Sequence, residues 1–172
     1  NVLVVDDLSP DGTGALADEL AQKDPRIFVE HRSGPRGLGN AYLYGFKWAL
    51  KRHYEYIFEM DADFSHNPDD LIRLYNACTI DGYDLSIGSR YVKGVNIINW
   101  PMSRLLLSFF ASKYVRLITG MPINDGTGGF KAWRVSILKK IKLSSIKSQG
   151  YSFQIEMNFW AWMLKARIIE IP

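Results

Sequence analysis

Two aspartates one residue apart, Asp61 and Asp63, are the residues whose types and spacing point most directly to chemistry. They follow residues 56–58, an apolar run that indicates a short buried strand, and they precede a turn-like stretch that ends at Pro68. Open α/β sheets bind their ligands beyond the carboxyl ends of the strands. Carboxylate oxygens at that place suit Mg²⁺ or Mn²⁺ held together with substrate phosphates. The pair therefore predicts a metal–diphosphate site; the alternative is that both acids only begin a solvated turn.

The composition is that of a folded domain and does not point to nucleic acid. The 172 residues are 47% hydrophobic and 13% aromatic, which suffices for one domain with its own core. The 21 basic and 18 acidic residues leave a net charge of only +3, so no nucleic-acid partner is predicted. The single cysteine, Cys78, excludes an internal disulfide and is expected in the core, and no Cys/His metal spacing is present. No apolar run approaches the roughly 18 residues of a membrane span.

The first 90 residues alternate between apolar runs and helical patterns. Gly, Pro, Asn and Asp clusters separate the segments, as expected for turns. This alternation predicts a three-layer α/β/α sandwich with a mainly parallel sheet and right-handed crossovers. Strands are expected at 2–5, 26–31, 56–63 and 84–88, and helices at 14–22, 40–52 and 69–79.

The alternation of strand and helix patterns ends after residue 90. A long helix is expected at 101–119, with apolar residues almost all around it and a few basic ones. Such a helix belongs either to the core or to a membrane surface, where its basic residues would face anionic headgroups. Further elements are expected at 130–133 (strand), 135–141 and 153–165 (helices) and 167–171 (strand).

Both ends of the sequence lie at or next to an expected strand. The chain opens directly on a strand without an initiator Met, and it stops just after the last expected strand. We therefore interpret residues 1–172 as a domain fragment that is truncated at both ends.

Six segments in a fixed order resemble the dolichol-phosphate (polyprenol-phosphate) mannosyltransferases of glycosyltransferase family 2. The resemblance spans nearly the whole chain and implies an inverting enzyme with the GT-A fold of nucleotide-diphospho-sugar transferases. It also implies that residues 1–172 are a single catalytic domain lacking the family's first strand and its C-terminal end. The segments are 5–13, 36–41, 60–68, 88–94, 125–131 and 150–156.

The resemblance also implies substrates, a cofactor and a location. The donor is expected to be GDP-mannose, the cofactor Mg²⁺ or Mn²⁺, and the acceptor a polyprenyl phosphate at a membrane surface. The protein is expected at the cytoplasmic face of that membrane, either peripheral or anchored by segments outside this sequence. Alternatives are a related transferase that uses UDP-glucose or another nucleotide sugar, and a non-catalytic relative that binds a nucleotide sugar.

Residue roles on the donor side follow from the matched motifs. Asp63 is expected to hold the metal, and Asp61 to bind either the metal or the ribose. Asp7, with Asp6, matches the place where the family recognises the nucleoside; the alternative is a turn aspartate that caps a helix. Three further residues are expected to contact the donor: Arg36 in the Gly-rich loop (residues 34–39), Lys131, and Gln154. Gln154 is expected to shape the sugar pocket or the acceptor pocket.

Two arginines, Arg90 and Arg104, are the candidates for binding the acceptor phosphate, because a guanidinium matches phosphate geometry. The alternative for each is a surface ion pair. A phosphate monoester has a second pKa near 6 and needs orientation more than deprotonation at pH 7. Asp125 is expected either to act as a general base or to hold a basic side chain in place, and we favour the second role. His66 is expected to be structural or to face solvent.

Three positions depart from the family pattern. Leu8 stands where the family often has a polar residue. Lys131 stands where an arginine is usual, which keeps the charge but loses the planar fork. Ser65 stands where some members have a metal-binding Gln, so diphosphate and water are expected to complete the metal's coordination.

Overall fold

The computed structural model describes residues 1–92 and 102–172, except for the side chains of residues 102, 104, 105 and 107. The predicted strands and helices in this part of the chain are all present, with ends that differ by a few residues. The strands are β1 (Val2–Asp6), β2 (Ile27–His31), β3 (Tyr56–Glu59), β4 (Leu85–Gly88), β5 (Lys131–Arg134) and β6 (Ile168–Ile171). The helices are α1 (Thr13–Lys23), α2 (Leu38–Leu50), α3 (Leu71–Thr79), α4 (Met102–Thr119), α5 (Val135–Leu138) and α6 (Tyr151–Met163), with short 3₁₀ helices at Pro68–Asp70 and Leu143–Ser145.

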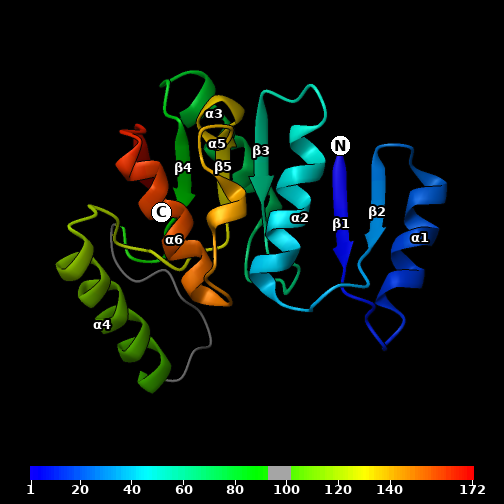
Figure 1. The fold of residues 1–172 in the computed structure, drawn as a ribbon, viewed down its shortest axis with the longest axis horizontal. Coiled ribbons are helices and arrows are strands. Elements are labelled where there is room, and N and C mark those ends of the chain that lie inside the picture. The colour runs from blue at the N-terminus through cyan, green and yellow to red at the C-terminus, as the bar shows by residue number, and fades with distance from the viewer. Residues whose placement is uncertain (93–101) are drawn as a thin grey trace.

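The strands form two groups. β1 and β2 pair in parallel, and the remaining strands form a second sheet in the order β3-β5-β4-β6. In that sheet β4 and β6 are parallel, whereas β5 runs antiparallel to both β3 and β4. The arrows of β1, β2, β3 and β4 point the same way (Figure 1), so their carboxyl ends lie at one edge. The mainly parallel arrangement is confirmed, with β5 as the reversed strand.

Helices cover both faces of the second sheet, which gives the predicted three layers. On one face, Phe46 of α2 and Phe153 of α6 belong to the main core, and the ring of Trp133 on β5 packs edge-on against Phe46 at 6.2 Å. On the other face, Leu74 and Cys78 of α3 pack against β5. Burying a large apolar side chain contributes about 1.5–3 kcal/mol, so these contacts account for much of the stability of the sheet. Cys78 is fully buried, as expected.

Helix α2 connects the two groups of strands. A side chain added at Gly45 of α2 would meet Val5 and Leu3 of β1, so this helix lies close against β1. Phe46, the next residue, points into the core of the second sheet. α2 therefore fixes the position of the β1–β2 sheet relative to the second sheet.

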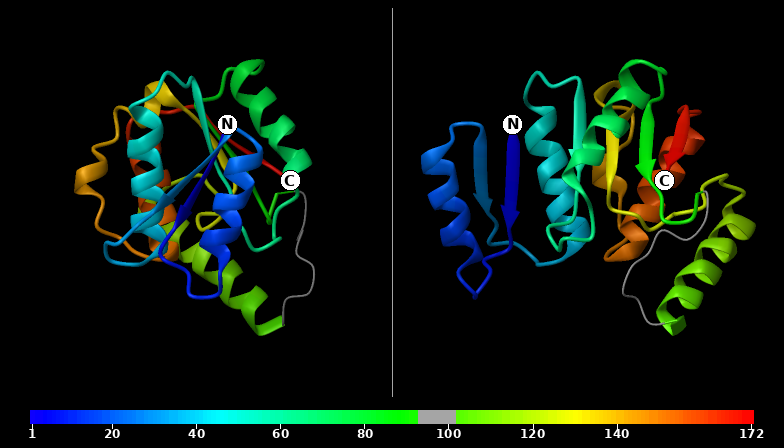
Figure 2. Two further views of the ribbon diagram at one scale, coloured as in Figure 1. Left: turned by 90° about the vertical axis from the view of Figure 1, so that its right-hand side faces the viewer. Right: turned by 180° about the vertical axis from the view of Figure 1, so that it is seen from behind.

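Helix α4 lies at the margin of the molecule, on the side of β4 and β6 and away from α1 (Figure 2). It ends at Gly120, whose φ of +70° is a left-handed conformation that glycine adopts without strain. Its apolar side chains are largely exposed, among them Phe110, Tyr114 and Leu117, the last at 81%. Of the two interpretations of this helix, the core helix is therefore wrong for most of its described surface. Residue 101, the expected start, lies outside the described residues, and no described helix is long and apolar enough to cross a bilayer.

Candidate active site

Acidic and basic side chains lie at or just after the carboxyl ends of four strands, β1 to β4. Asp6 and Asp7 end or follow β1, and Asp61 follows β3. Arg32 follows β2, and Arg90 follows β4. Because β1 to β4 point the same way (Figure 1), these residues gather at one edge of the molecule, the edge where α/β sheets bind ligands.

Asp61 is a partly buried carboxylate held in a fixed position. The Tyr42 hydroxyl of α2 donates a 2.5 Å hydrogen bond to Asp61 Oδ1, and His66 Nε2 lies 3.8 Å from Asp61 Oδ2. The His66 imidazole, and then the Tyr42 hydroxyl, lower the pKa of Asp61 against the opposing effect of burial. Burial in turn raises the pKa of Tyr42, which therefore remains a protonated donor. Asp61 is thus an ionised, oriented acceptor at neutral pH.

Asp63 is exposed to solvent, two residues farther along the turn. Ser65 donates to Asp63 Oδ1 from its hydroxyl at 2.5 Å and from its backbone amide at 3.1 Å, and these bonds lower the pKa of Asp63. Phe64 between them is fully exposed and has a φ of +60°, a conformation that costs free energy for a non-glycine residue. The turn therefore presents the Asp63 carboxylate outward.

The donor chemistry of this turn fits a hard divalent cation. Both Asp61 and Asp63 have lowered pKa values, so their oxygens are charged at neutral pH. Within the described residues no three His, Cys, Asp or Glu side chains form a metal-binding group. Mg²⁺ or Mn²⁺ would therefore take its other ligands from substrate phosphates and water, as Mg²⁺ commonly does.

A buried ionic network lies behind the turn. Lys131 of β5 lies 3.4 Å from Glu59 of β3 and donates a short hydrogen bond to Gln154 of α6. Trp133 Nε1 and Gln154 Nε2 donate to the two Glu59 oxygens at 3.2 and 3.4 Å. Burial raises the pKa of Glu59 and lowers that of Lys131, and the charge of each partner opposes the shift. Lys131 and Gln154, both expected to touch the donor, are 0% and 1% exposed here.

Arg90 forms a two-pronged ion pair with Asp125. Its Nε and Nη2 donate to the two carboxylate oxygens at 2.7 and 2.6 Å, and its backbone amide donates to Asp125 Oδ2 at 2.9 Å. Arg90 Nη2 also donates to the Thr127 hydroxyl at 2.7 Å. The Asp125 side chain is fully buried beneath the guanidinium, which remains partly exposed. This geometry fits the orienting role of Asp125 better than that of a general base.

The loop after Asp125 lies between this ion pair and the turn that carries Asp61 and Asp63, called the acidic turn below. A Cβ added at Gly128 would lie 3.5 Å from the Asp125 carboxylate, and one added at Gly129 would lie 2.6 Å from Asp61 Oδ2. The second contact is closer than real Cβ atoms approach, so a side chain at residue 129 would require the loop or Asp61 to move. Asp61 and Arg90 therefore adjoin the same short loop, although they follow different strands.

Glu170 of β6 holds the loop around Asp125 in place through hydrogen bonds. Its Oε1 accepts from Ser89 Oγ and from the Asp125 backbone amide, each at 2.8 Å. Its Oε2 accepts from the backbone amide and the side-chain amide of Asn124, also at 2.8 Å. One carboxylate thus holds Ser89, the residue before Arg90, as well as Asn124 and the backbone of Asp125.

Asp7 is held by the Gly-rich loop. Arg32, itself buried, donates to Asp7 Oδ1, and the backbone amide of Gly37 donates to Asp7 Oδ2 at 3.1 Å. Arg36 is exposed and donates to the Leu8 carbonyl at 2.8 Å. The structure therefore brings Asp7 and Arg36 to the same loop region, with Asp7 already in contact with protein donors.

Asp6 lies in a second, separate contact. Its carboxylate accepts from the Ser9 amide at 3.1 Å and lies 3.1 Å from His31 Nδ1, and Asp18 of α1 lies 3.1 Å from His31 Nε2. The Ser9 bond first, and then His31, lower the pKa of Asp6. The two carboxylates raise the pKa of His31. Asp6 is thus a buried residue that stabilises the fold through Ser9 and His31, and it remains a candidate for nucleoside recognition.

Arg104 lies near the beginning of α4, and its side chain is outside the part that the structure describes. Its expected contact with an acceptor phosphate stays a prediction.

Three residues of this site were not expected from sequence: Glu59, Glu170 and Tyr42. The first two share a signal that could have found them, since each is the lone carboxylate of an otherwise apolar strand. Such a carboxylate is costly to bury without partners, so its presence indicates a buried network. Tyr42 carries no such signal, because its spacing on α2 is that of an ordinary half-buried helix residue.

Curated proteins with similar sequences have related names. The chain is 51% identical over 173 residues to the polyprenol monophosphomannose synthase of Mycolicibacterium smegmatis, and 48% identical over 172 residues to the undecaprenyl-phosphate mannosyltransferase of Micrococcus luteus. Both alignments cover the whole chain, which spans 65% and 70% of the length of these two relatives. The resemblance that the motifs indicate is confirmed.

Solved structures show the same fold at low sequence identity. A glucosyl-3-phosphoglycerate synthase from Mycobacterium tuberculosis, crystallised with Mn²⁺, UDP-glucose and phosphoglyceric acid, matches 98% of the chain with a TM-score of 0.67 at 14% identity, over 56% of its own length. S. aureus TarS 1–349 matches 99% of the chain with a TM-score of 0.60 at 20% identity, over 48% of its own length. The GT-A type of α/β fold is therefore confirmed.

A family model supports the same assignment. The model for glycosyl transferase family 2 matches residues 1–142, which contain the acidic turn, the Arg90–Asp125 pair and the Gly-rich loop. The chain therefore belongs to glycosyl transferase family 2.

Proposed function

We propose that residues 1–172 are one catalytic domain of an inverting glycosyltransferase that moves mannose from GDP-mannose to a polyprenyl phosphate. The observation that carries this proposal is that the guanidinium of Arg90 and the turn with Asp61 adjoin one loop, through Asp125 and Gly129. The names of the two curated relatives support both the sugar and the lipid phosphate.

On the donor side, the acidic turn is the place for the nucleotide diphosphate. Mg²⁺ or Mn²⁺ held by Asp63 and Asp61 would supply Lewis-acid neutralisation of the leaving diphosphate. Tyr42 keeps Asp61 in the geometry that this requires. Asp7, which follows β1, and Arg36, in the Gly-rich loop after β2, would contact the nucleoside and its phosphates.

Lys131 and Gln154 would support the site without touching the donor. Both are buried and hold Glu59, the last residue of the strand that leads into the acidic turn. Removing one member of a buried charge pair leaves the other charge uncompensated, which costs several kcal/mol. We therefore propose that these residues position the turn.

On the acceptor side, a phosphate dianion needs orientation and no general base. Its second pKa is near 6, so most of it is already dianionic at pH 7. Arg90 is held by Asp125 and Thr127 and is pre-oriented for a phosphate, with Arg104 of α4 as the second candidate. Asp125 then acts by fixing the guanidinium.

We further propose that the protein works at a membrane surface, on the cytoplasmic face, through a peripheral contact or an anchor elsewhere in the polypeptide. Phe110, Tyr114 and Leu117 expose apolar surface along α4. This helix lies at the molecular margin, on the side of β4, the strand that Arg90 follows (Figure 2). An amphipathic helix of this kind can lie in the headgroup region of a bilayer. A polyprenyl acceptor would reach the site from there.

The experiment that tests the proposal assays the full-length protein with four donors: GDP-mannose, GDP-glucose, UDP-glucose and UDP-GlcNAc. Each is offered with a polyprenyl phosphate, with and without Mn²⁺. We expect transfer only from GDP-mannose, only with the metal, and with inversion at the anomeric carbon. Transfer from a UDP-sugar would replace the donor in the proposal, and metal-dependent GDP-mannose binding without turnover would identify a non-catalytic relative.

A further inference from the structure

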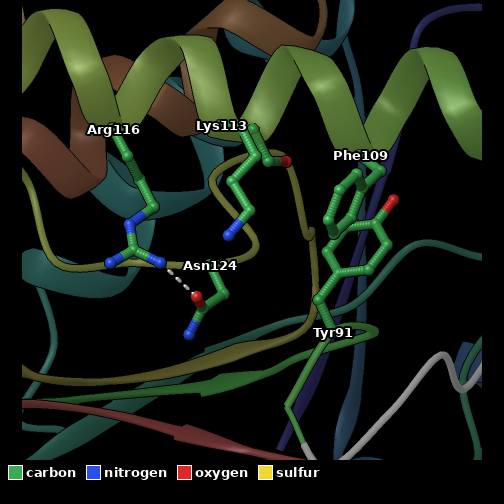
Figure 3. A pocket seen from close by; sticks show the side chains of 6 residues that line it. Tyr91, Phe109, Lys113, Arg116 and Asn124 are labelled. Carbon is green, nitrogen blue, oxygen red and sulfur yellow. Dashed lines mark hydrogen bonds between the residues drawn. The ribbon is translucent and has the colours of Figure 1, made fainter.

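A small basic pocket lies between α4 and the loop that precedes Asp125 (Figure 3). It has a volume of about 80 Å³, which by the same measure is several times the 10–15 Å³ that one water needs. A small oxyanion fits this volume. The pocket is lined by Tyr91, Phe109, Ser112, Lys113, Arg116 and Asn124.

Two cations point into this pocket. The side chains of Lys113 and Arg116 extend from α4 toward the loop that carries Asn124 (Figure 3). Arg116 donates to Asn124 Oδ1, and Lys113 Nζ lies 5.4 Å from the centre of the Phe109 ring. Among the described residues neither cation forms an ion pair with a carboxylate. Two positive charges that have no carboxylate partner in the described part of the chain therefore line one pocket.

A buried hydroxyl lines the same pocket. Ser112 is 6% exposed, and its Oγ has no hydrogen-bond partner among the described residues. A buried polar group without a partner costs free energy, so such a group commonly indicates a ligand or water. Glu170, which accepts from the lining residue Asn124, is already occupied by hydrogen bonds from Ser89 and the 124–125 loop. The pocket thus offers hydrogen-bond donors and positive charge, which is the chemistry that recognises phosphate.

The exposed surface of α4 indicates where such a phosphate comes from. Phe110, Tyr114 and Leu117 each follow a pocket residue by one position, so an exposed apolar stripe runs beside the pocket along the same helix. A molecule with a phosphate in the pocket and hydrocarbon on the stripe is an amphipathic lipid. The sequence suggested only that the basic residues of this helix face headgroups, whereas the structure gathers Lys113 and Arg116 around one pocket.

We propose that this pocket is a binding site for the phosphomonoester headgroup of a membrane lipid. It goes beyond the proposed function, because it uses neither Arg90 nor Arg104 and its binding can be measured without turnover. The site would fix α4, and with it the acceptor side of the domain, against the bilayer.

The test compares binding of the full chain to two kinds of phosphatidylcholine vesicle. One contains phosphatidic acid, a phosphomonoester, and the other contains phosphatidylglycerol, a phosphodiester, at matched surface potential. We expect a preference for phosphatidic acid. Ser112→Ala and Lys113→Gln should each reduce that preference by about tenfold, the loss expected for one hydrogen bond to a charged group. The exposed lysines at the end of α5 provide the matched control, Lys140→Gln, which should leave the preference unchanged.

A second arm titrates the chain with inorganic phosphate and follows the Ser112 and Lys113 signals by NMR. Saturation by free phosphate, together with a lack of preference between the vesicles, would keep the phosphate site but overturn the lipid as its source. Equal binding to both vesicles, no phosphate saturation, and a Ser112→Ala variant that behaves like the parent would overturn the proposal. The remaining binding would then be due to diffuse charge on α4.

Discussion

Glu170 accepts a 2.8 Å hydrogen bond from the backbone amide of Asp125, the residue whose carboxylate holds Arg90. The two residues are 45 positions apart in sequence. This contact ties the last strand of the sheet to the loop that orients the guanidinium. The position of Arg90 therefore depends on a carboxylate that touches neither Arg90 nor any expected substrate.

The first prediction tests this dependence with Glu170→Gln. A glutamine amide has one acceptor oxygen in place of two, so part of the set of four hydrogen bonds must be lost. Unpaired buried donors cost about 1–3 kcal/mol each. We expect kcat with the polyprenyl acceptor to fall by about tenfold or more, while the affinity for the nucleotide sugar changes little.

The matched control is Asp84→Asn. Asp84 accepts from the Arg167 amide at 2.9 Å and pairs with Arg134 at 3.5 Å, just before β4 and so at the opposite end of the strands from Arg90. It should lower the melting temperature without a specific effect on acceptor use. Equal losses in both variants would mean that Glu170 contributes only to stability.

The second prediction concerns the hydroxyl that orients Asp61. Tyr42→Phe removes one donor and keeps the ring that stacks on Phe153. Loss of a residue that orients a metal ligand typically costs about 10–100-fold in metal affinity. We expect metal-dependent binding of the nucleotide sugar to weaken by about tenfold, measured by calorimetry in a Mn²⁺ titration. Tyr44→Phe on the same helix, whose hydroxyl donates to Glu30, should have no such effect.

The third prediction uses the close approach of Gly129 to Asp61. Gly129→Ala would place a Cβ 2.6 Å from the carboxylate, so either the loop or Asp61 must move. A displacement of about 1 Å at a reacting site can cost about 100-fold. Activity should fall by up to that factor. Gly126→Ala in the same loop, whose added Cβ would lie 3.6 Å from Ile155, should retain most of the activity.

The fourth prediction is a pH dependence of stability that comes from His31. Its hydrogen bonds with Asp6, and then with Asp18, raise the pKa of His31 in the folded state. A raised pKa stabilises the fold fully below the ordinary His value of about 6.5, and this contribution is lost as the pH rises through the folded-state value. His31→Gln should therefore reduce the free energy of unfolding more at pH 5.5 than at pH 9. Urea denaturation at both pH values measures this, with the exposed His53→Gln as control. A difference that grows with pH would contradict it.

The sequence predicts the acidic turn because every signal for it is local. An apolar run, two carboxylates and a proline define a strand end within 13 residues, Tyr56 to Pro68. The alternation of strands and helices likewise predicts the layers. Apolar periodicity contains no direction, however, so it could not show that β5 runs antiparallel to both of its neighbours.

The sequence could not predict which charged residues are buried. Lys131 lies in a motif that suggested contact with the donor. Because β5 pairs between β3 and β4, the Lys131 side chain is instead buried against the sheet, next to Glu59 of β3. That partner is 72 positions away, and Glu170 is similarly distant from Ser89, 81 positions along the chain. Tertiary contacts of this range leave no periodic trace. The only sequence signal for these contacts is the presence of Glu59 and Glu170 in the otherwise apolar strands β3 and β6.

The last prediction separates a phosphate acceptor from a hydroxyl acceptor. Arg90→Lys keeps a positive charge but cannot keep both prongs of the contact with Asp125 and a planar face for phosphate. We expect the variant to raise the KM for the polyprenyl phosphate or to lower kcat, with the affinity for GDP-mannose nearly unchanged. The pH–rate profile of the parent should rise through about pH 6, as the acceptor loses its second proton. A phosphonate acceptor with a higher second pKa should move this rise upward by the same amount. If the rise instead moves with Asp125→Asn or His66→Gln and ignores the acceptor, a protein group is removing a proton, and the nucleophile is a hydroxyl.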